Sequence, residues 1–140
     1  MRFSAARTVR FGECDPAGVV YYPVFFNWFH ELMECWFEEA LDLPYSRCLQ
    51  QLGFPAKETS SEFFRPCAMG EKLRLELFLS HLGKRSMRIE IEVFSKDILK
   101  AKGYVVCVCI GLSKDGFQFS SSEIPAYLRD KMVKFLRSDT

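Results

Sequence analysis

The first forty residues change from the alternation of a strand to the period of a helix. Residues 3–11 alternate loosely between apolar and polar and contain Thr and Val, which predicts a first strand. Residues 12–20 are predicted to form a loop. From Pro23 to Leu41 apolar residues recur at steps of three and four, which predicts a long helix with a wide, mostly buried face. That face comprises Phe25, Phe29, Leu32, Trp36 and Ala40, joined by Phe26, Met33 and Phe37.

A second, short helix is predicted over 45–52, after Pro44 and before Gly53. Beyond it, apolar residues recur at every second position, which is the period of a strand. Four strands follow, indicated by alternation or by a continuous apolar run: 61–67, 73–79, 87–93 and 104–112. Leu82-Gly83-Lys84 predicts a hairpin turn. The last strand is apolar at nearly every position, so we expect it at the centre of the sheet with both faces covered. A closing helix is predicted to begin at Pro125, with Ile124, Leu128, Met132 and Phe135 as its apolar positions.

This order of elements predicts a single domain over residues 1–140, without repeats or linkers. One very apolar helix and a set of amphipathic strands are best buried in an α+β architecture, with one curved antiparallel sheet wrapped around a long central helix. Phe78, Phe94 and Val106 fall on the opposite parity from the core positions. They suggest that another subunit covers the outer sheet face or an edge, although scattered surface hydrophobes are the alternative.

Composition narrows the function classes. Hydrophobic residues make up 49% of the 140 residues and the formal net charge is +1, which indicates a globular chain without a nucleic-acid or membrane-binding patch. We find no apolar run of membrane-spanning length and no signal-peptide core, and expect a cytoplasmic protein. The six cysteines form no CxxC pair and are predicted to be buried free thiols. With only two histidines, no metal site is expected.

Candidate chemistry lies in residues 11–22, FGECDPAGVVYY, just before the long helix. Pro16 biases Asp15 towards an extended backbone, and Gly18 permits a turn or the close approach of a ligand. A carboxylate in a rigid turn beside a helix N-terminus can supply an attacking oxygen or a general base, while the helix N–H groups polarise a carbonyl. The alternative for Asp15 is a turn-forming or helix-capping role.

The block from Gly12 to Pro23, followed by an aromatic helix, resembles the 4-hydroxybenzoyl-CoA thioesterase group of hotdog-fold acyl-CoA thioesterases. It matches the pattern Asp/Glu-x-Asp-x-x-Gly-x-Val-x-Tyr/His, and the order of elements agrees over nearly the whole chain. The resemblance implies a hotdog fold and hydrolysis of an acyl-CoA to the free acid and coenzyme A, which belongs to the substrate, so that no separate cofactor is needed. It also implies a homodimer, which we expect to pair into a tetramer.

The resemblance assigns roles to particular residues. Asp15 corresponds to the catalytic carboxylate and Tyr22 to the residue whose backbone N–H polarises the thioester carbonyl. Gly18 and Val19 are expected beside the acyl chain, and the segment Gly83-Lys84-Arg85-Ser86 is expected to contact the phosphates of coenzyme A. Aromatic residues near the loop would accept an aryl or a medium acyl group: Tyr21, Tyr22, Phe25 and Phe26. On residue pattern alone, Lys84 and Arg85 are a solvated turn.

Other polar residues are weaker candidates. Glu13 is expected to tune the loop or to pair with Arg10. Glu31, Glu34 and His30 could contribute from the central helix, although a place on its polar face is the simpler explanation of all three. One of Thr59, Ser60 and Ser61 could hydrogen-bond the substrate. Alternative functions are hydrolysis of an acyl-carrier-protein thioester and non-catalytic acyl binding. A dehydratase is disfavoured, because its chemistry usually relies on a histidine with a carboxylate and the loop has no histidine.

Overall fold

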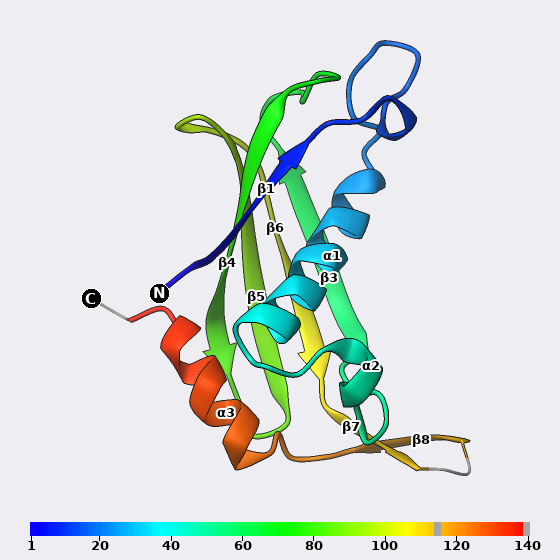
Figure 1. Cartoon of the computed structure of the whole chain (residues 1–140), viewed down its shortest axis with the longest axis vertical. Coiled ribbons are helices and arrows are strands. Elements are labelled where there is room, and N and C mark those ends of the chain that lie inside the picture. Colours follow the sequence, from blue (N-terminus) through cyan, green and yellow to red (C-terminus); the bar gives the residue numbers. More distant parts are fainter. Residues whose placement is uncertain (114–115, 139–140) are drawn as a thin grey trace.

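A long helix lies against one face of a twisted antiparallel sheet (Figure 1). This arrangement is seen in a computed structural model that describes residues 1–113 and 116–138. The helix is α1 (Val24–Glu39). The sheet has five strands in the order β1-β4-β5-β6-β3, and every neighbouring pair is antiparallel. Their bounds are β1 (Phe3–Thr8), β4 (Lys72–Leu82), β5 (Ser86–Ser95), β6 (Ile98–Val108) and β3 (Ala56–Phe63). The predicted fold class is confirmed.

Smaller elements close the end of the molecule near the C-terminus of α1 (Figure 1). A second sheet has the order β2-β7-β8, with β2 (Leu52–Gly53), β7 (Ile110–Ser113) and β8 (Gly116–Ser121). The short helix α2 is Tyr45–Cys48. The predicted closing helix is α3 (Ala126–Met132), which follows Pro125 and continues into a 3-10 turn at Val133–Phe135.

Three predicted boundaries were wrong. The first strand ends at Thr8 instead of Phe11, because the chain turns into a 3-10 helix at Phe11–Glu13. The predicted helix 45–52 ends at Cys48, since Leu52–Gly53 pairs with β7 instead. The strand expected over 61–67 is β3, which ends at Phe63. This strand is exposed along nearly its whole length, so it lacks the alternation by which the others were found.

The strand expected over 104–112 has two parts. Its first part belongs to β6, which lies between β5 and β3 as predicted for a central strand. After Cys109 the chain enters β7 in the other sheet. The prediction that both faces are covered was wrong within this chain, because Tyr104 and Val106 are half-exposed on the outer face.

The core lies between α1 and the inner face of the sheet. Trp28, Trp36, Phe29 and Phe37 of α1 are fully buried. Opposite them lie buried strand residues: Leu77, Leu79, Ile89, Ile91 and Val93. The helix can approach β6 closely because position 103 is a glycine, where an added Cβ would lie 2.6 Å from Phe29 Cε2. This packing fixes the N-terminal end of α1, next to the Asp15 loop.

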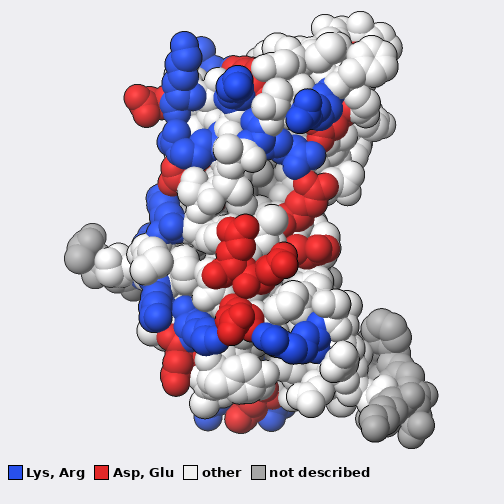
Figure 2. Space-filling model, viewed as in Figure 1, with Lys and Arg blue, Asp and Glu red and all other residues white. Residues whose placement is uncertain are grey.

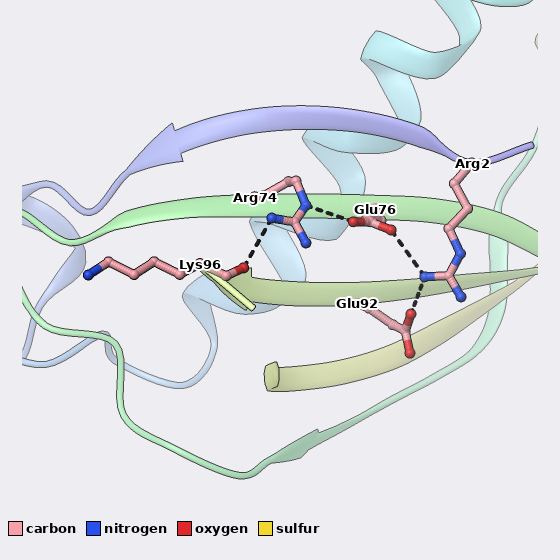
Figure 3. A network of polar contacts seen from close by, with 5 residues as sticks. All are labelled: Arg2, Arg74, Glu76, Glu92 and Lys96. Atoms are coloured by element: carbon pink, nitrogen blue, oxygen red, sulfur yellow. Dashed lines mark hydrogen bonds and ion pairs between the residues drawn. The ribbon is translucent and has the colours of Figure 1, made fainter. Parts of the chain in front are cut away.

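On the outer face of the sheet, charged side chains form a network of polar contacts (Figure 3). The Arg2 guanidinium lies 4.4 Å from the centre of the Phe78 ring and pairs with Glu76 and Glu92. Arg74 similarly covers Phe94 at 4.8 Å and pairs with Glu76. Phe78 is only 7% exposed within the single chain, so its burial needs no second subunit. The burial of Phe78 therefore does not by itself indicate a subunit contact, whereas Phe94 and Val106 remain half-exposed and the contact stays a prediction.

The cysteines are free thiols, as predicted. Cys48, Cys67, Cys107 and Cys109 are buried, whereas Cys14 and Cys35 are only half-buried. In the described part of the chain, none of the helices has the length and apolar character needed to cross a membrane.

Candidate active site

The loop after β1 holds Asp15 in a hydrogen-bonded turn. Asp15 N–H donates to Val19 O at 2.9 Å, and Gly18 N–H donates back to Asp15 O at 2.9 Å. Pro16 occupies the second position of this turn, where its fixed φ is favourable, and Gly18 has φ +80°. That left-handed conformation is strained for any other L residue, so Gly18 is required by the turn itself. The loop is therefore rigid at the carboxylate.

The Asp15 carboxylate has one occupied and one open oxygen. Its Oδ1 accepts a hydrogen bond from Ala17 N–H at 2.9 Å. The other oxygen, Oδ2, has no partner among residues 1–113 and 116–138, and the side chain is half-buried. One oxygen is thus anchored while the other can meet a substrate or a water molecule.

The helix entrance differs from the expected row of open N–H groups. The N–H groups of Val24, Phe25 and Phe26 donate to the carbonyls of Tyr21, Tyr22 and Pro23 in tight turns, and Pro23 has no N–H. Within the described chain this leaves the Tyr22 N–H as the donor without a partner. Tyr22 is also the residue that the resemblance assigned to carbonyl polarisation. Tyr22 as a residue is 61% exposed.

Glu13 joins the loop to both neighbouring elements. Its Oε2 accepts hydrogen bonds from Arg7 Nη2 at 2.6 Å and Trp28 Nε1 at 2.7 Å, and its Oε1 accepts from Arg10 N–H at 2.8 Å. The predicted Arg10 ion pair was wrong, because Arg7 supplies the opposite charge. Partial burial by itself raises the pKa of Glu13. The hydrogen bonds from Trp28, the Arg10 backbone and Arg7, together with the positive charge of Arg7, lower it by more than burial raises it, so the pKa lies below its ordinary value. Glu13 is a structural clamp.

An apolar pocket of about 610 Å³ lies between α1, α2 and the β3–β6 half of the sheet. Its walls are formed by Phe26, Phe29, Met33, Tyr45, Phe54, Ile89, Ile91, Val105 and Ile110, with Ala56 and Thr59 from β3 and His30 and Glu34 at polar positions. Sequence reasoning had selected Phe26, His30, Glu34 and Thr59 but not Tyr45 or Val105. Those two residues are distant in sequence from the loop, and only the folded sheet brings them to the pocket.

The structure does not bring all predicted site residues to this pocket. Asp15, Gly18, Val19, Tyr21 and Tyr22 lie in the loop and at the helix entrance, outside the pocket lining. Phe25 is 4% exposed and packs on Trp28 and Phe63, so it is a core residue. His30 and Glu34 are linked to each other at 2.7 Å, and the Thr59 hydroxyl donates to Tyr104 O.

The predicted phosphate-binding turn lies at the other end of the sheet from Asp15. Met69 N–H, just before β4, donates to Gly18 O of the loop, whereas Lys84, Arg85 and Ser86 come after β4 ends. Eleven residues of strand span roughly 33 Å. Arg85 Nη1 donates to Ser121 Oγ at 3.2 Å. Within one chain, these residues and Asp15 do not form one site.

Comparison with known proteins identifies relatives of the whole chain. Residues 9–134 match the family model described as the thioesterase-like superfamily. The chain is 31% identical to a 1,4-dihydroxy-2-naphthoyl-CoA hydrolase from Nostoc punctiforme, over 99% of this chain and 89% of the relative. It is also 31% identical to the enzyme of the same name from Trichodesmium erythraeum, covering 91% of this chain and 96% of the relative.

Solved structures give the same fold. A gentisyl-coenzyme A thioesterase superposes with a TM-score of 0.81 at 24% identity, covering 91% of this chain and 99% of the other. A 1,4-dihydroxy-2-naphthoyl-CoA thioesterase from Synechocystis superposes with a TM-score of 0.82 at 23% identity, covering 95% and 96%. The family match spans the Asp15 loop, α1 and strands β3, β4, β5 and β6 of the main sheet. The chain therefore belongs to the thioesterase-like superfamily.

Proposed function

We propose that this protein hydrolyses an aryl-CoA thioester to the aromatic acid and coenzyme A, with Asp15 as the catalytic carboxylate. The observation that carries the proposal is the Asp15 carboxylate itself, which one hydrogen bond fixes through Oδ1 while Oδ2 stays open. The loop that holds it leads directly into α1, where the Tyr22 N–H has no partner within the described chain. Relatives at 31% identity bear the name of an aryl-CoA hydrolase.

The chemistry requires an attacking oxygen and a donor for the carbonyl oxygen. Asp15 either takes a proton from water as the water oxygen attacks the thioester carbon, or attacks that carbon itself to form a mixed anhydride that water then cleaves. In both routes the carbon–sulfur bond breaks and the coenzyme A thiolate leaves and is protonated. The Tyr22 N–H stabilises the negative charge on the carbonyl oxygen. One turnover in ¹⁸O-labelled water tests for the anhydride: label in Asp15 shows that an anhydride formed and that water cleaved it at the Asp15 carbonyl, whereas attack of water on the thioester carbon places the label in the aromatic acid.

The apolar pocket is the place for the acyl group. Its volume and aromatic lining suit a one- or two-ring aromatic acid, and its buried wall residues exclude water. However, the lining includes no residue of the Asp15 loop. A second copy of the chain can resolve this separation.

The exposed edge of β3 supports a homodimer. At its Phe63 end the Phe63 ring lies 6.4 Å from the Tyr22 ring, beside the Asp15 loop, and at its other end Ala56 and Thr59 line the pocket. Antiparallel pairing of β3 with the same strand of a second copy places each Phe63 end beside the partner's Ala56 end. The loop of one copy then faces the pocket of the other, and each site is shared. Pairing of two dimers into a tetramer stays a prediction, which sedimentation analysis tests.

The proposed activity is tested by thiol release from a panel of CoA thioesters. The panel contains 1,4-dihydroxy-2-naphthoyl, 2,5-dihydroxybenzoyl, 4-hydroxybenzoyl, hexanoyl and acetyl groups, and is measured for the wild type and Asp15→Asn. Asparagine keeps the Oδ1 acceptor for Ala17 N–H, so the thermal midpoint should not change. We expect aryl substrates to be preferred and kcat to fall at least about a hundredfold in the variant. Equal rates for both proteins would contradict a role of Asp15, and no turnover of any CoA thioester would contradict the activity.

The shared site is tested by mixing two inactive variants. Asp15→Asn removes the carboxylate, and Val105→Trp fills the pocket from β6. In a mixed dimer, the open pocket of the Asp15→Asn copy faces the intact Asp15 of the other copy. We expect activity to return to about a quarter of the wild-type value after unfolding and refolding a 1:1 mixture, since half of the dimers are mixed and each has one intact site. A mixture that stays inactive would show that each chain uses its own pocket.

A further inference from the structure

The connection between β3 and β4, residues 64–71, is hydrogen-bonded to the loop after β1. Val20 N–H donates to Cys67 O at 2.9 Å, and Met69 N–H donates to Gly18 O at 3.0 Å. The second arm of the loop is thus paired with its own first arm on one side and with this connection on the other. The position of the loop's carboxylate therefore depends on where residues 64–71 lie.

This connection buries little of its own surface. Among residues 64–70, Cys67 is buried and the other six are exposed. A connection with so little buried apolar surface depends on polar contacts for its position. We therefore looked for the side chains that hold it.

Lys100 of β6 holds both ends of the connection. Its backbone carbonyl accepts hydrogen bonds from Phe64 N–H at 2.8 Å and from Arg65 N–H at 3.1 Å. Its ammonium group donates to Pro66 O at 3.1 Å and pairs with Glu71 Oε2 at 3.0 Å. One residue thus fixes the connection where it leaves β3 and where it enters β4.

Glu71 links this contact to the middle of the connection. Its Oε1 accepts a hydrogen bond from Ala68 N–H at 2.9 Å, while Oε2 holds Lys100. Ala68 in turn lies opposite Val19 of the loop after β1 in an antiparallel bridge. Burial by itself raises the pKa of Glu71, but its hydrogen bonds and the charge of Lys100 lower it by more, so the carboxylate is ionised at neutral pH.

Lys100 differs from a solvated surface lysine. Figure 2 shows many Lys and Arg side chains gathered on the surface at the Asp15 end of the molecule. The Lys100 side chain, by contrast, is only 13% exposed. Moving an ammonium group out of water costs free energy that its partners must offset. Lys100 therefore depends on Pro66 O and Glu71 as much as they depend on it.

From these contacts, we propose that Lys100 is a positioning residue for Asp15, acting through Glu71 and residues 64–71. This inference rests on the proposed function and adds a residue to it. Lys100 is not among the residues that line the apolar pocket. Its removal should therefore displace the carboxylate without changing the fit of the acyl group, which predicts a loss in kcat and not in KM.

The first test compares Lys100→Met with the matched control Lys131→Met. The Lys131 ammonium also donates to a backbone carbonyl, Leu41 O at 3.1 Å, but at the other end of α1. With an aryl-CoA substrate, Lys100→Met should lower kcat by about tenfold or more and change KM by less than about twofold, because small displacements of a catalytic group are costly. Lys131→Met should keep the wild-type kcat. A wild-type kcat in folded Lys100→Met would overturn the proposal.

Glu71→Gln is a milder variant that keeps the fold if Lys100→Met does not. The glutamine oxygen can still accept the hydrogen bond from Ala68 N–H, while the charge opposite Lys100 is lost. It should lower kcat in the same direction by a smaller factor, again with KM unchanged. A rise in KM without a change in kcat would overturn the proposal.

A double-mutant cycle shows whether Lys100 acts through Asp15. In Asp15→Asn the carboxylate is already absent, so adding Lys100→Met should not slow the remaining rate further. If the double variant is slower than Asp15→Asn by the full factor seen for Lys100→Met alone, Lys100 acts independently of Asp15 and the proposal is refuted.

Amide hydrogen exchange separates this proposal from the proposed activity, because it needs no turnover. The Val20 and Met69 amides, which join the loop to residues 64–71, should exchange about tenfold faster in Lys100→Met than in the wild type, and at the wild-type rate in Lys131→Met. If no thioester is cleaved, the proposed activity fails, whereas faster exchange still supports Lys100 as the residue that holds the loop. Unchanged exchange in Lys100→Met would overturn the proposal for an active or an inactive protein.

Discussion

The contact between α1 and β6 at Gly103 gives a sharp prediction for stability. A Cβ added at Gly103 would lie 2.4 Å from Ser60 O and 2.6 Å from Phe29 Cε2. The first neighbour is backbone of β3 and the second is a ring that is 1% exposed, so neither can rotate away. Restoring ordinary contact distances needs a displacement of about 1 Å of β3 or of α1.

Gly103→Ala should therefore destabilise the protein by about 3 kcal/mol, at the upper end of the usual cost of overpacking a core. For a chain of this length the thermal midpoint should fall by roughly 10 °C. The same displacement moves the helix start that carries Tyr22, so thioester hydrolysis should also slow.

Urea denaturation followed by the fluorescence of Trp28 and Trp36 measures this change, because both indoles are buried in the affected core. Gly111→Ala is the matched control. It also lies in a strand, and an added Cβ there meets nothing within 4 Å, so its effect should stay within about 0.5 kcal/mol. If both variants have the same stability as the wild type, α1 does not pack on β6 as closely as described.

Three other outcomes follow from the contacts described. Glu13→Gln should lower the free energy of unfolding in urea by about 2 kcal/mol, since it removes the charge of the more buried of the two carboxylate partners of Arg7. Glu34→Gln, at an exposed pair, should lower it by less than about 0.5 kcal/mol. The folded-state pKa of Glu13 lies below its unfolded value, so the stability that its ionised carboxylate contributes is complete above about pH 4.5 and is lost as the pH falls through the folded pKa. The difference in unfolding free energy between wild type and Glu13→Gln should therefore shrink in acid. A difference that is independent of pH would contradict the role of Glu13 as a clamp. Burial raises the pKa of Cys107 to about 12 and those of Cys67 and Cys109 to about 11, and Cys48 is also buried. A disulfide reagent at pH 8 should therefore modify at most Cys14 and Cys35 before the protein unfolds. Rapid reaction of four or more thiols would show a looser core.

The sequence by itself determined the elements whose burial is one-sided and periodic. The aromatic stripe of α1 and the alternation in β4 and β5 each bury one face, so apolar residues had to recur at the period of the helix or strand. The turn at Asp15 could also be predicted, because Pro16 restricts the local backbone and Gly18 permits a turn conformation that other residues avoid. Together with the family resemblance, these local features were enough to suggest the fold and Asp15 as the candidate carboxylate.

Only the tertiary structure decided which distant residues meet. Edge strand β3 has no apolar alternation because its residues face solvent, and β2 is too short to have a period. Glu13 took Arg7 as its ion partner instead of the adjacent Arg10, since β1 carries Arg7 towards Trp28 on α1. Strand β1 pairs with β4, so that Thr8 lies opposite Lys72 although the long helix and β3 separate them in the sequence. Such contacts depend on strand pairing between segments far apart in the sequence, and no local pattern encodes them.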